Sequence, residues 1–368
     1  MYYIILTLLL LFSLKELFSK KRYPIFFVMV YGLMTLMATF RYGQIHDYFA
    51  YGFLYKNPHI MEAKDPGFAV LMVLSQNIGI DYITFVAIMS FLCMVLAFPF
   101  FSKKCHYSFI SLLIFYSYTF LEGAMGSFRQ GLCLSLLLCI YPLLEKRKYI
   151  WFTVGVIAGC LIHLSFIVCL LFPFILKTQI HEKKYVSLIL IFFLTFASLQ
   201  IDYSVFLPSF LSNRVSVYLE KANSAGFLQL LLRFALIIPL LLIKTEKGTT
   251  LSHAKSIYFT GFCLYCLLGA DVLTAGRIEY YFRTFLCLFI AELSITKNRW
   301  NPKIFFFFSF MIIINTFVWF KNIDFACENG NYNKDINAFN FPYISIFNHK
   351  DLYLYSNPPV QNMKYVEF

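Results

Sequence analysis

Residues 304–320 read IFFFFSFMIIINTFVWF, a run without a single charge. Similar apolar blocks occupy 2–14 and 185–199. A helix that crosses a bilayer needs about 20 mostly apolar residues. Of the 368 residues in the chain, 60% are hydrophobic and 14% are charged, whereas a soluble fold carries roughly 25% charge. The sequence therefore predicts a protein embedded in lipid, which argues against a soluble enzyme or a nucleic-acid-binding protein.

The breaks between apolar runs predict an all-α, polytopic membrane protein with about 12 crossings. Candidate spans lie near 2–18, 23–40, 82–101, 107–121, 130–144, 185–201, 227–243, 255–270, 281–296 and 304–320. The block 149–176 carries His163 near its middle, and we interpret it as a hairpin of two short helices. The stretch 66–79 is too short to cross comfortably, so we expect a re-entrant or interfacial helix there.

The positions of the basic residues predict the orientation, because lysine and arginine accumulate in cytoplasmic loops. With the hairpin in place, one side holds 18 cations and five acids, and the rest of the chain holds 13 cations and 14 acids. We therefore expect both termini on the extracytoplasmic, periplasmic side. Residues 1–320 are expected to form a membrane-embedded domain, and residues 321–368 an extracytoplasmic tail.

Arginine is distributed differently from lysine. Six arginines lie at the predicted outer face, each at a different segment boundary: Arg41, Arg129, Arg214, Arg233, Arg277 and Arg283. The planar guanidinium binds phosphate through two hydrogen bonds, whereas lysine offers a point charge. A set of arginines below the outer headgroups would suit an anionic lipid head, in particular a diphosphate. Alternatively, individual arginines snorkel or pair with nearby acids: Asp47, Asp202, Asp271 or Glu279.

The first predicted outer loop reads Phe40-Arg41-Tyr42-Gly43-Gln44-Ile45-His46-Asp47-Tyr48. Its glycine permits close approach of a ligand, and its aromatic and polar side chains suit sugar rings and hydroxyls. Asp47 is a candidate general base for an acceptor hydroxyl. The alternative is an interfacial aromatic belt that contains an Arg41–Asp47 pair.

Two further polar sites fall at membrane depth. Arg129 and Gln130 open one predicted helix, and His163 is the histidine that interrupts an apolar block. A neutral His163 can accept a proton, and a protonated one can hold a phosphate oxygen. The alternative for His163 is a hydrogen-bonding cap in a membrane turn. The sequence contains no phosphate-binding loop, zinc-protease motif or paired acidic metal site, so we expect no metal and no cofactor.

Taken in order, these motifs resemble those of the EpsG/Wzy-type family of bacterial polysaccharide polymerases, over residues 1–320. The motifs are Arg41-Tyr42-Gly43 with Asp47-Tyr48, Pro66-Gly67-Phe68, Arg129-Gln130, Ile162-His163-Leu164-Ser165, Arg214 with Tyr218, and Arg277-Ile278 with Tyr281-Phe282. The resemblance implies a membrane glycosyltransferase of the bacterial inner membrane. It would move a growing glycan from one polyprenyl diphosphate to the sugar of another lipid-linked repeat unit, giving O antigen, capsule or exopolysaccharide.

The resemblance also implies roles for individual residues. Asp47 and His163 are alternative proton acceptors, and Arg129 completes the candidate catalytic set. The candidates for substrate binding are Arg41, Gly43, Tyr48, Gln130, Arg214, Arg277, Tyr281 and Arg283. The implied partners are an undecaprenyl-diphosphate-linked oligosaccharide, membrane lipids and a chain-length regulator protein, with no nucleic acid.

Two other functions share these features. A glycan ligase or membrane acyltransferase would use the same lipid substrate, arginines and histidine. A flippase or transporter of the lipid-linked oligosaccharide should carry charge through the whole bilayer. The polar residues here gather on the predicted outer side, with Glu292 as the main deep exception, and this favours chemistry at the outer face.

Overall fold

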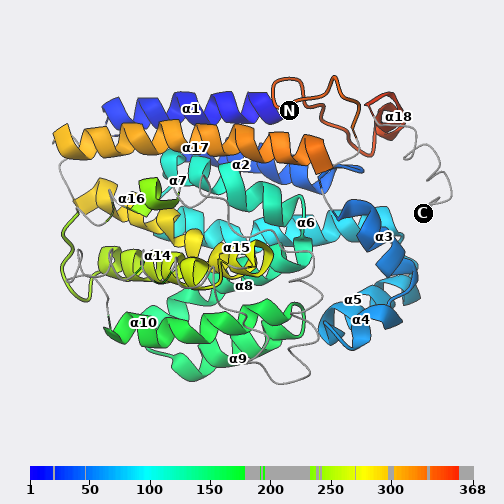
Figure 1. Cartoon of the computed structure of the whole chain (residues 1–368), viewed down its shortest axis with the longest axis horizontal. Helices are drawn as coiled ribbons and strands as arrows, with labels where there is room; N and C mark the ends of the chain where they lie inside the picture. The colour runs from blue at the N-terminus through cyan, green and yellow to red at the C-terminus, as the bar shows by residue number, and fades with distance from the viewer. Residues whose placement is uncertain are drawn as a thin grey trace. The chain divides into compact units, whose positions relative to one another are not determined.

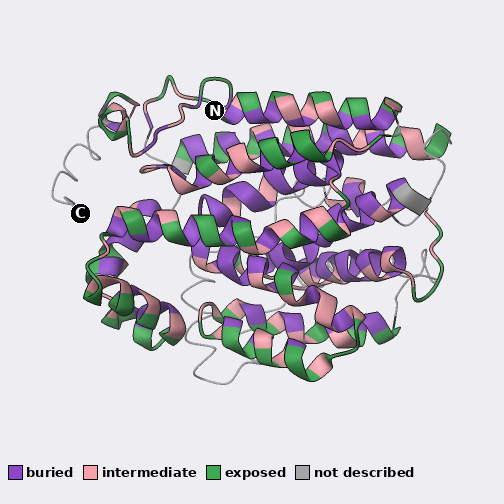
Figure 2. Ribbon diagram, turned by 180° about the vertical axis from the view of Figure 1, so that it is seen from behind, coloured by how far each residue is buried: buried purple, intermediate pink, exposed green. Residues whose placement is uncertain are grey.

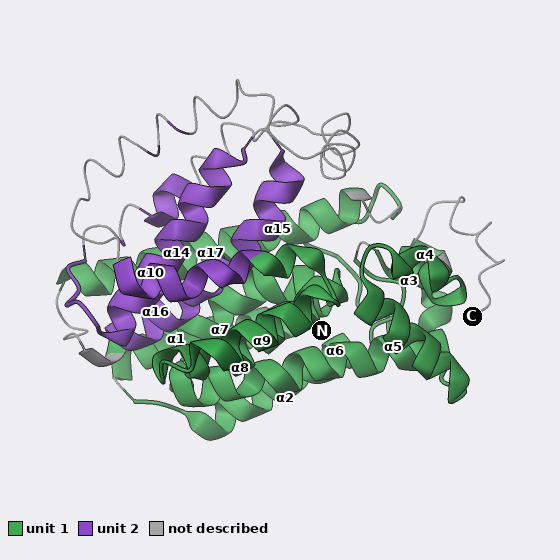
Figure 3. Ribbon diagram, turned by 90° about the horizontal axis from the view of Figure 1, so that it is seen from below, with its two compact units in different colours: residues 1–167, 294–368 green, residues 168–293 purple. Residues whose placement is uncertain are grey.

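The computed structural model describes residues 1–19, 21–45, 47–178, 243–269, 271–296, 302–329 and 332–355, together with 191, 194, 233–237 and 240. These residues form helices, with one isolated antiparallel bridge between Arg41 and Ser345 (Figure 1). Most of the predicted crossings at 185–201 and 227–243, together with Arg214, lie outside the described residues. The chain divides into two compact units, residues 1–167 with 294–368 and residues 168–293 (Figure 3).

The first unit combines the N-terminal helices with the last long helix. Its elements are α1 (Tyr2–Ser19), α2 (Pro24–Thr39), α3 (Tyr48–Lys56), α4 (His59–Glu62), α5 (Pro66–Asn77), α6 (Tyr82–Pro99), η1 (Phe100–Lys104), α7 (Phe109–Ile114), η2 (Phe115–Ala124), α8 (Phe128–Glu145), α9 (Tyr149–Cys160), α17 (Pro302–Asn329), η5 (His349–Asp351) and α18 (Leu352–Tyr355). The second unit holds α10 (Phe172–Thr178), α14 (Thr250–Leu267), α15 (Val272–Arg283) and most of α16 (Phe285–Thr296). The short segment η3 (Leu164–Leu171) crosses the boundary.

Four helices among the described residues are long and apolar enough to cross a membrane: Tyr2–Ser19, Tyr82–Lys104, Phe128–Glu145 and Pro302–Glu328. Shorter apolar helices lie at Pro24–Thr39, Phe109–Ala124, Tyr149–Cys160 and Leu164–Thr178. Large apolar side chains are exposed along α2, α9 and α17 (green in Figure 2), for example Ile25 at 74% and Ile150 at 79%. Such surfaces suit contact with lipid. Among the described residues, the structure confirms an all-helical architecture with four candidate membrane spans, but the predicted number of 12 is not confirmed.

Helix α8 lies at the core of the first unit, where it packs against α6, α9 and η2. Its residues Phe128, Cys133, Leu137 and Tyr141 are fully buried. The start of α8 closely approaches the end of η2, since a Cβ atom on Gly131 would lie 2.7 Å from the carbonyl carbon of Gly123. The glycine therefore fixes the turn that leads into the first residues of α8.

The block 149–176 is interrupted near His163, where the sequence predicts a turn. Helix α9 ends at Cys160, and His163 lies in the turn before η3. A Cβ atom on Gly159 would lie 2.3 Å from a ring carbon of Phe166, so the two arms meet closely beside the turn. The stretch after residue 65 also forms a short helix, α5, within the predicted bounds 66–79.

Two predicted boundaries were wrong. The predicted spans 255–270 and 281–296 leave 271–280 as a loop, but this segment is helical from Val272, and the predicted span 281–296 is divided between the end of α15 and α16. Asp271 explains the difference, because its carboxylate caps α15 by accepting hydrogen bonds from the backbone N–H groups of Leu273 (3.0 Å) and Thr274 (3.3 Å). In addition, α17 continues to Asn329, beyond the expected end at 320.

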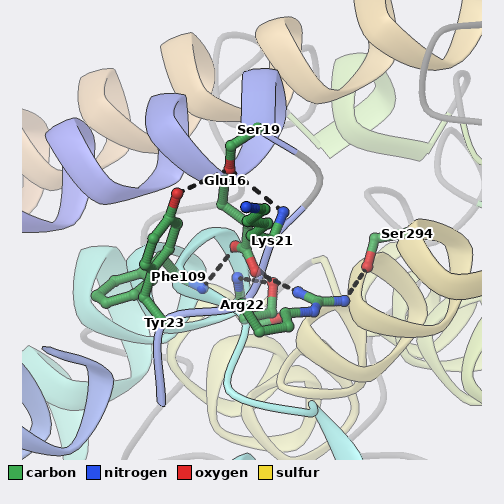
Figure 4. A network of polar contacts seen from close by, with 9 residues as sticks. Glu16, Ser19, Lys21, Arg22, Tyr23, Phe109 and Ser294 are labelled. Atoms are coloured by element: carbon green, nitrogen blue, oxygen red, sulfur yellow. Dashed lines mark hydrogen bonds and ion pairs between the residues drawn. The ribbon is translucent and has the colours of Figure 1, made fainter. Parts of the chain in front are cut away.

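A buried ion pair organises the connection between α1 and α2 (Figure 4). The Arg22 guanidinium donates to the carboxylate of Glu16 and to the hydroxyl of Ser294. Glu16 is only 1% exposed, and it also accepts the backbone N–H of Phe109 at 2.9 Å. The network joins the predicted cytoplasmic ends of α1, α2 and α7 and satisfies a carboxylate that would otherwise be costly to bury.

The segment that follows α17 returns to the beginning of the chain. We name residues 332–348 the C-terminal strap. The backbone N–H of Tyr42 donates to the carbonyl of Ile344 (3.0 Å), and the N–H of Ile346 donates to the carbonyl of Phe40 (2.9 Å). These two hydrogen bonds flank Arg41 and Ser345 in the antiparallel bridge. The first predicted outer loop is thus paired with a strap about 300 residues away along the chain.

Candidate active site

The carboxylate of Asp65 joins three segments that are distant in the sequence. It forms an ion pair with Arg129, and its Oδ1 atom accepts the backbone N–H of Leu164 at 3.3 Å. The Nδ1 atom of His163 lies 3.8 Å from Oδ2. Burial favours the neutral acid, but His163 and the Arg129 guanidinium favour the carboxylate, so the pKa of Asp65 lies below its ordinary value of 3.8. Asp65 is therefore an anion shared by an arginine and a histidine.

The local sequence explains how Asp65 reaches this position. Pro66 begins α5, and a proline suits the first helical turn because it lacks an N–H group. The backbone N–H of Gly67 donates to the carbonyl of Leu161 at 2.8 Å. A Cβ atom on residue 67 would lie 2.8 Å from Cβ of Leu161, so only glycine permits this contact. The close contact holds the hairpin turn, with His163, against the start of α5.

Arg129 lies in the first turn of α8 and is enclosed by aromatic residues. Its Nε donates to the hydroxyl of Tyr51 at 3.0 Å. The guanidinium carbon lies 5.2 Å from the ring centre of Tyr51 and 5.7 Å from that of Phe68, within the range of cation–π contacts. The side chain is 21% exposed, and its Nη2 makes no hydrogen bond to a described residue. One edge of the guanidinium is therefore fixed, and the other is open to a ligand.

Asp47 approaches the same turn from the other side. It precedes α3 in a left-handed conformation, with φ at 70°, and its side chain does not cap that helix. Instead, its Oδ2 atom accepts the hydroxyl of Ser127 at 2.8 Å. Because Ser127 lies two residues before Arg129, Asp47 faces the turn that carries the arginine. Asp47 is exposed, so its second oxygen is accessible. We name Asp47, Tyr51, Asp65, Arg129 and His163 together the Asp65 cluster.

Arg41 occupies a separate position and does not pair with Asp47. It is 1% exposed, and its Nη1 atom donates to the carbonyls of Ala38 (3.0 Å) and Ala124 (2.9 Å) and to the hydroxyl of Ser90. The alternative of an Arg41–Asp47 pair was therefore wrong. Neighbouring Gly43 adopts φ of 62° and lies against Leu352, where a Cβ atom would come within 2.7 Å.

The second unit contains the remaining arginine candidates that the structure describes. Arg233 pairs with Glu279, with Nε and Nη2 each 2.9 Å from the carboxylate, as the alternative interpretation predicts for individual arginines. The guanidinium carbon of Arg233 also lies 3.6 Å from the ring centre of Tyr265. On α15, Arg277 is exposed, whereas Tyr281 and Arg283 are buried. The structure thus assigns Arg233 a partner within its own unit.

Among the predicted catalytic residues, the structure brings Arg129, His163 and Asp47 into one neighbourhood. Gln130 is buried beside Arg129. Sequence reasoning missed Asp65 and Tyr51, which supply the contacts to Arg129. A signal for Asp65 was present, since an acid stands directly before the Pro66-Gly67 pair that opens an apolar helix. In the described part of the chain, no three His, Cys, Asp or Glu side chains gather as metal ligands.

Comparison with known proteins gives one family. A family model described as the EpsG family matches residues 24–345. The match includes all five residues of the Asp65 cluster and extends to Ser345, the strap residue that bridges to Arg41. No curated protein and no solved structure matches the chain significantly.

Proposed function

Because the chain belongs to the EpsG family, we propose that it is a membrane glycosyltransferase that polymerises lipid-linked oligosaccharides. Its substrates would be repeat units carried on a polyprenyl diphosphate, joined on the outer face of the bacterial inner membrane. The product would be O antigen, capsule or exopolysaccharide. Both termini and the Asp65 cluster would then lie on the extracytoplasmic side, in agreement with the distribution of basic residues.

The observation that carries the proposal is the ion pair between Arg129 and Asp65 beside His163. Arg129 and a protonated His163 share the single carboxylate of Asp65, so these three residues together then carry one net positive charge. Arg129 also retains an open edge beside the accessible carboxylate of Asp47. A cation next to a base is the arrangement that a transfer from a diphosphate to a hydroxyl requires.

The proposed reaction follows from these positions. The hydroxyl oxygen of the acceptor sugar attacks the anomeric carbon of the donor glycan, and the bond from that carbon to the diphosphate oxygen breaks. The diphosphate leaves with the electron pair, and Arg129 stabilises its charge. Asp47 takes the proton of the acceptor hydroxyl. Asp65 holds Arg129 and His163 in place, and His163 contributes a hydrogen bond to the substrate or to the site.

The test is the glycan phenotype of a deletion strain. If the chain is a polymerase, single repeat units persist on the lipid carrier and long polymer disappears. Loss of every exported unit would instead identify a flippase, and normal polymer that fails to reach its final acceptor would identify a ligase. Complementation with Arg129→Lys should restore little polymer, because lysine keeps the charge but loses the guanidinium geometry. Arg147→Lys, at an exposed loop position, is the matched control and should restore full length.

A further inference from the structure

Arg41 is a buried cation with unsatisfied hydrogen-bond donors. Its hydrogen bonds to described residues all leave from Nη1. Its Nε and Nη2 atoms are buried without a hydrogen-bond partner, and no described carboxylate forms an ion pair with it. A buried charge without a counter-ion is costly, and unpaired donors add to that cost. The position therefore favours an anion that accepts hydrogen bonds from the free edge of the guanidinium.

Two neighbouring groups strengthen this reading. The hydroxyl of Tyr48 is also buried without a hydrogen-bond partner, and it interacts electrostatically with Arg41. The backbone of Gly43, in its left-handed conformation, lies close to the same hydroxyl. The nearest acids are engaged elsewhere, because Asp47 binds Ser127 and Asp81 caps α6 through the N–H of Thr84 at 2.9 Å. Nε and Nη2 of Arg41 and the hydroxyl of Tyr48 are therefore buried donors without an acceptor, and no described carboxylate neutralises Arg41.

Helix α3 links this region to the Asp65 cluster. Tyr48, beside Arg41, and Tyr51, which accepts from Arg129 at 3.0 Å, are three residues apart and lie on one face of the helix. Arg129 thus contacts the same short helix whose first residue, Tyr48, interacts electrostatically with Arg41. The proposed polymerisation joins two lipid-linked substrates, each of which carries a diphosphate, and so requires two sites for that group.

The C-terminal strap covers the loop that carries Arg41. The Gln44 side chain accepts the N–H of Ile344 at 2.9 Å and donates to the carbonyl of Pro342. The hydroxyl of Tyr343 donates to the carbonyl of Met37 at 2.9 Å. Together with the backbone bridge, these contacts hold the loop under the strap. Because Arg41 is 1% exposed, a ligand reaches it only after a neighbouring segment moves, and the strap is the segment that pairs with its backbone.

We propose that Arg41, Gly43 and Tyr48 form a second oxyanion subsite, which takes a diphosphate group and which the C-terminal strap closes. The inference rests on the proposed function for the identity of the substrate. The subsite itself is tested by binding alone, without turnover, so that failure of one proposal is distinguishable from failure of the other.

The experiment measures binding of inorganic pyrophosphate to the purified full chain in nanodiscs of phosphatidylcholine, by calorimetry. Wild type should bind two equivalents, at the Arg41 subsite and at Arg129. Arg41→Lys and Arg129→Lys should each bind one. Tyr48→Phe removes a hydroxyl that has no partner in the structure, so it should leave Tm unchanged but weaken one of the two sites roughly fivefold or more. Gln44→Leu should open the strap and speed dissociation from the same site.

Three outcomes would overturn the subsite. The first is unchanged stoichiometry and affinity in both Arg41→Lys and Tyr48→Phe. The second is a fall in Tm on Tyr48→Phe with no change in binding, which would mean a structural hydroxyl. The third is the absence of pyrophosphate binding at this site in phosphatidylcholine, combined with Arg41-dependent stabilisation by phosphatidylglycerol, which would identify a structural lipid headgroup. Arg147→Lys is the control for charge-conserving replacement and should match wild type.

Discussion

Asp65 pairs with Arg129 across 64 residues of sequence, and the pair closes the space between the start of α5 and the start of α8. Its carboxylate is 6% exposed as a side chain, and the arginine is 21% exposed. Removal of one partner from such a buried pair leaves the other charge unpaired. We therefore expect both stability and activity to be sensitive to Asp65→Asn, which replaces one carboxylate oxygen with an amide nitrogen.

Asp65→Asn should lower the free energy of unfolding by about 3 kcal/mol, the cost of breaking a buried ion pair. It should also reduce polymer synthesis, because Arg129 and His163 lose their common partner. Denaturation of the purified protein and glycan chain-length analysis measure the two effects. The matched control is Glu145→Gln, which breaks the more exposed Lys104–Glu145 pair and should cost under about 1 kcal/mol. If both variants lost the same free energy of unfolding, burial would not strengthen the contribution of the Asp65–Arg129 pair.

The lowered pKa of Asp65 predicts the dependence of stability on pH. A carboxyl group whose folded pKa is depressed stabilises the fold above its unfolded pKa, near its ordinary value of 3.8. That contribution is lost as the pH falls from this value through the folded pKa. Wild type should therefore lose stability below about pH 4 more steeply than Asp65→Asn does. Parallel acid-unfolding curves for the two proteins would show that Asp65 is not the titrating group.

The two candidate proton acceptors can be separated by substitution. Asp47→Asn keeps the size of the side chain and the contact with Ser127 but removes the base, so turnover should stop while lipid-linked substrate still binds. His163→Gln should weaken turnover less completely, because the amide can still donate a hydrogen bond. Single-turnover assays with purified protein and lipid-linked repeat units compare them. Normal turnover by Asp47→Asn would eliminate Asp47 as the base. Complete inactivity of His163→Gln with intact substrate binding would instead assign proton transfer to His163.

Orientation is tested at the C-terminal strap. Lys334 is exposed, so a cysteine introduced there should react with a membrane-impermeant thiol reagent in intact spheroplasts. Of the native cysteines, seven of the ten are buried and Cys139 is exposed, so the unmodified chain serves as the labelling background. Labelling that requires lysis would place the strap in the cytoplasm and reverse the predicted topology.

The sequence predicted those features that depend on neighbouring residues. Apolar runs and charge breaks located the hairpin at 149–176 and the short helix after Asp65. The loop expected at 271–280 was wrong because its polar residues have partners that the sequence does not reveal: Asp271 caps the helix that follows, and Glu279 pairs with Arg233. These polar side chains therefore make contacts within the protein, whereas a loop would have exposed them to solvent.

The candidate site was predicted only in part, for a related reason. Arg129 and His163 are conspicuous because polar groups are rare in apolar segments. Asp65 lies in a polar loop, where an acid is ordinary, and its partners lie 64 and 99 residues further along the chain. The pairing of Arg41 with the strap depends on contacts across about 300 residues. A local sequence pattern does not reveal contacts between residues that lie so far apart in the chain.

The strap also has a consequence for biosynthesis. Residues 342–346 are synthesised about 300 residues after Phe40, Tyr42 and Gln44, yet they supply the partners of these three residues. The environment of the loop at 40–44 is therefore completed only once the strap has been synthesised. A nascent or prematurely terminated polypeptide would present that loop unprotected, which gives membrane quality-control proteases a means of recognising molecules that were never finished.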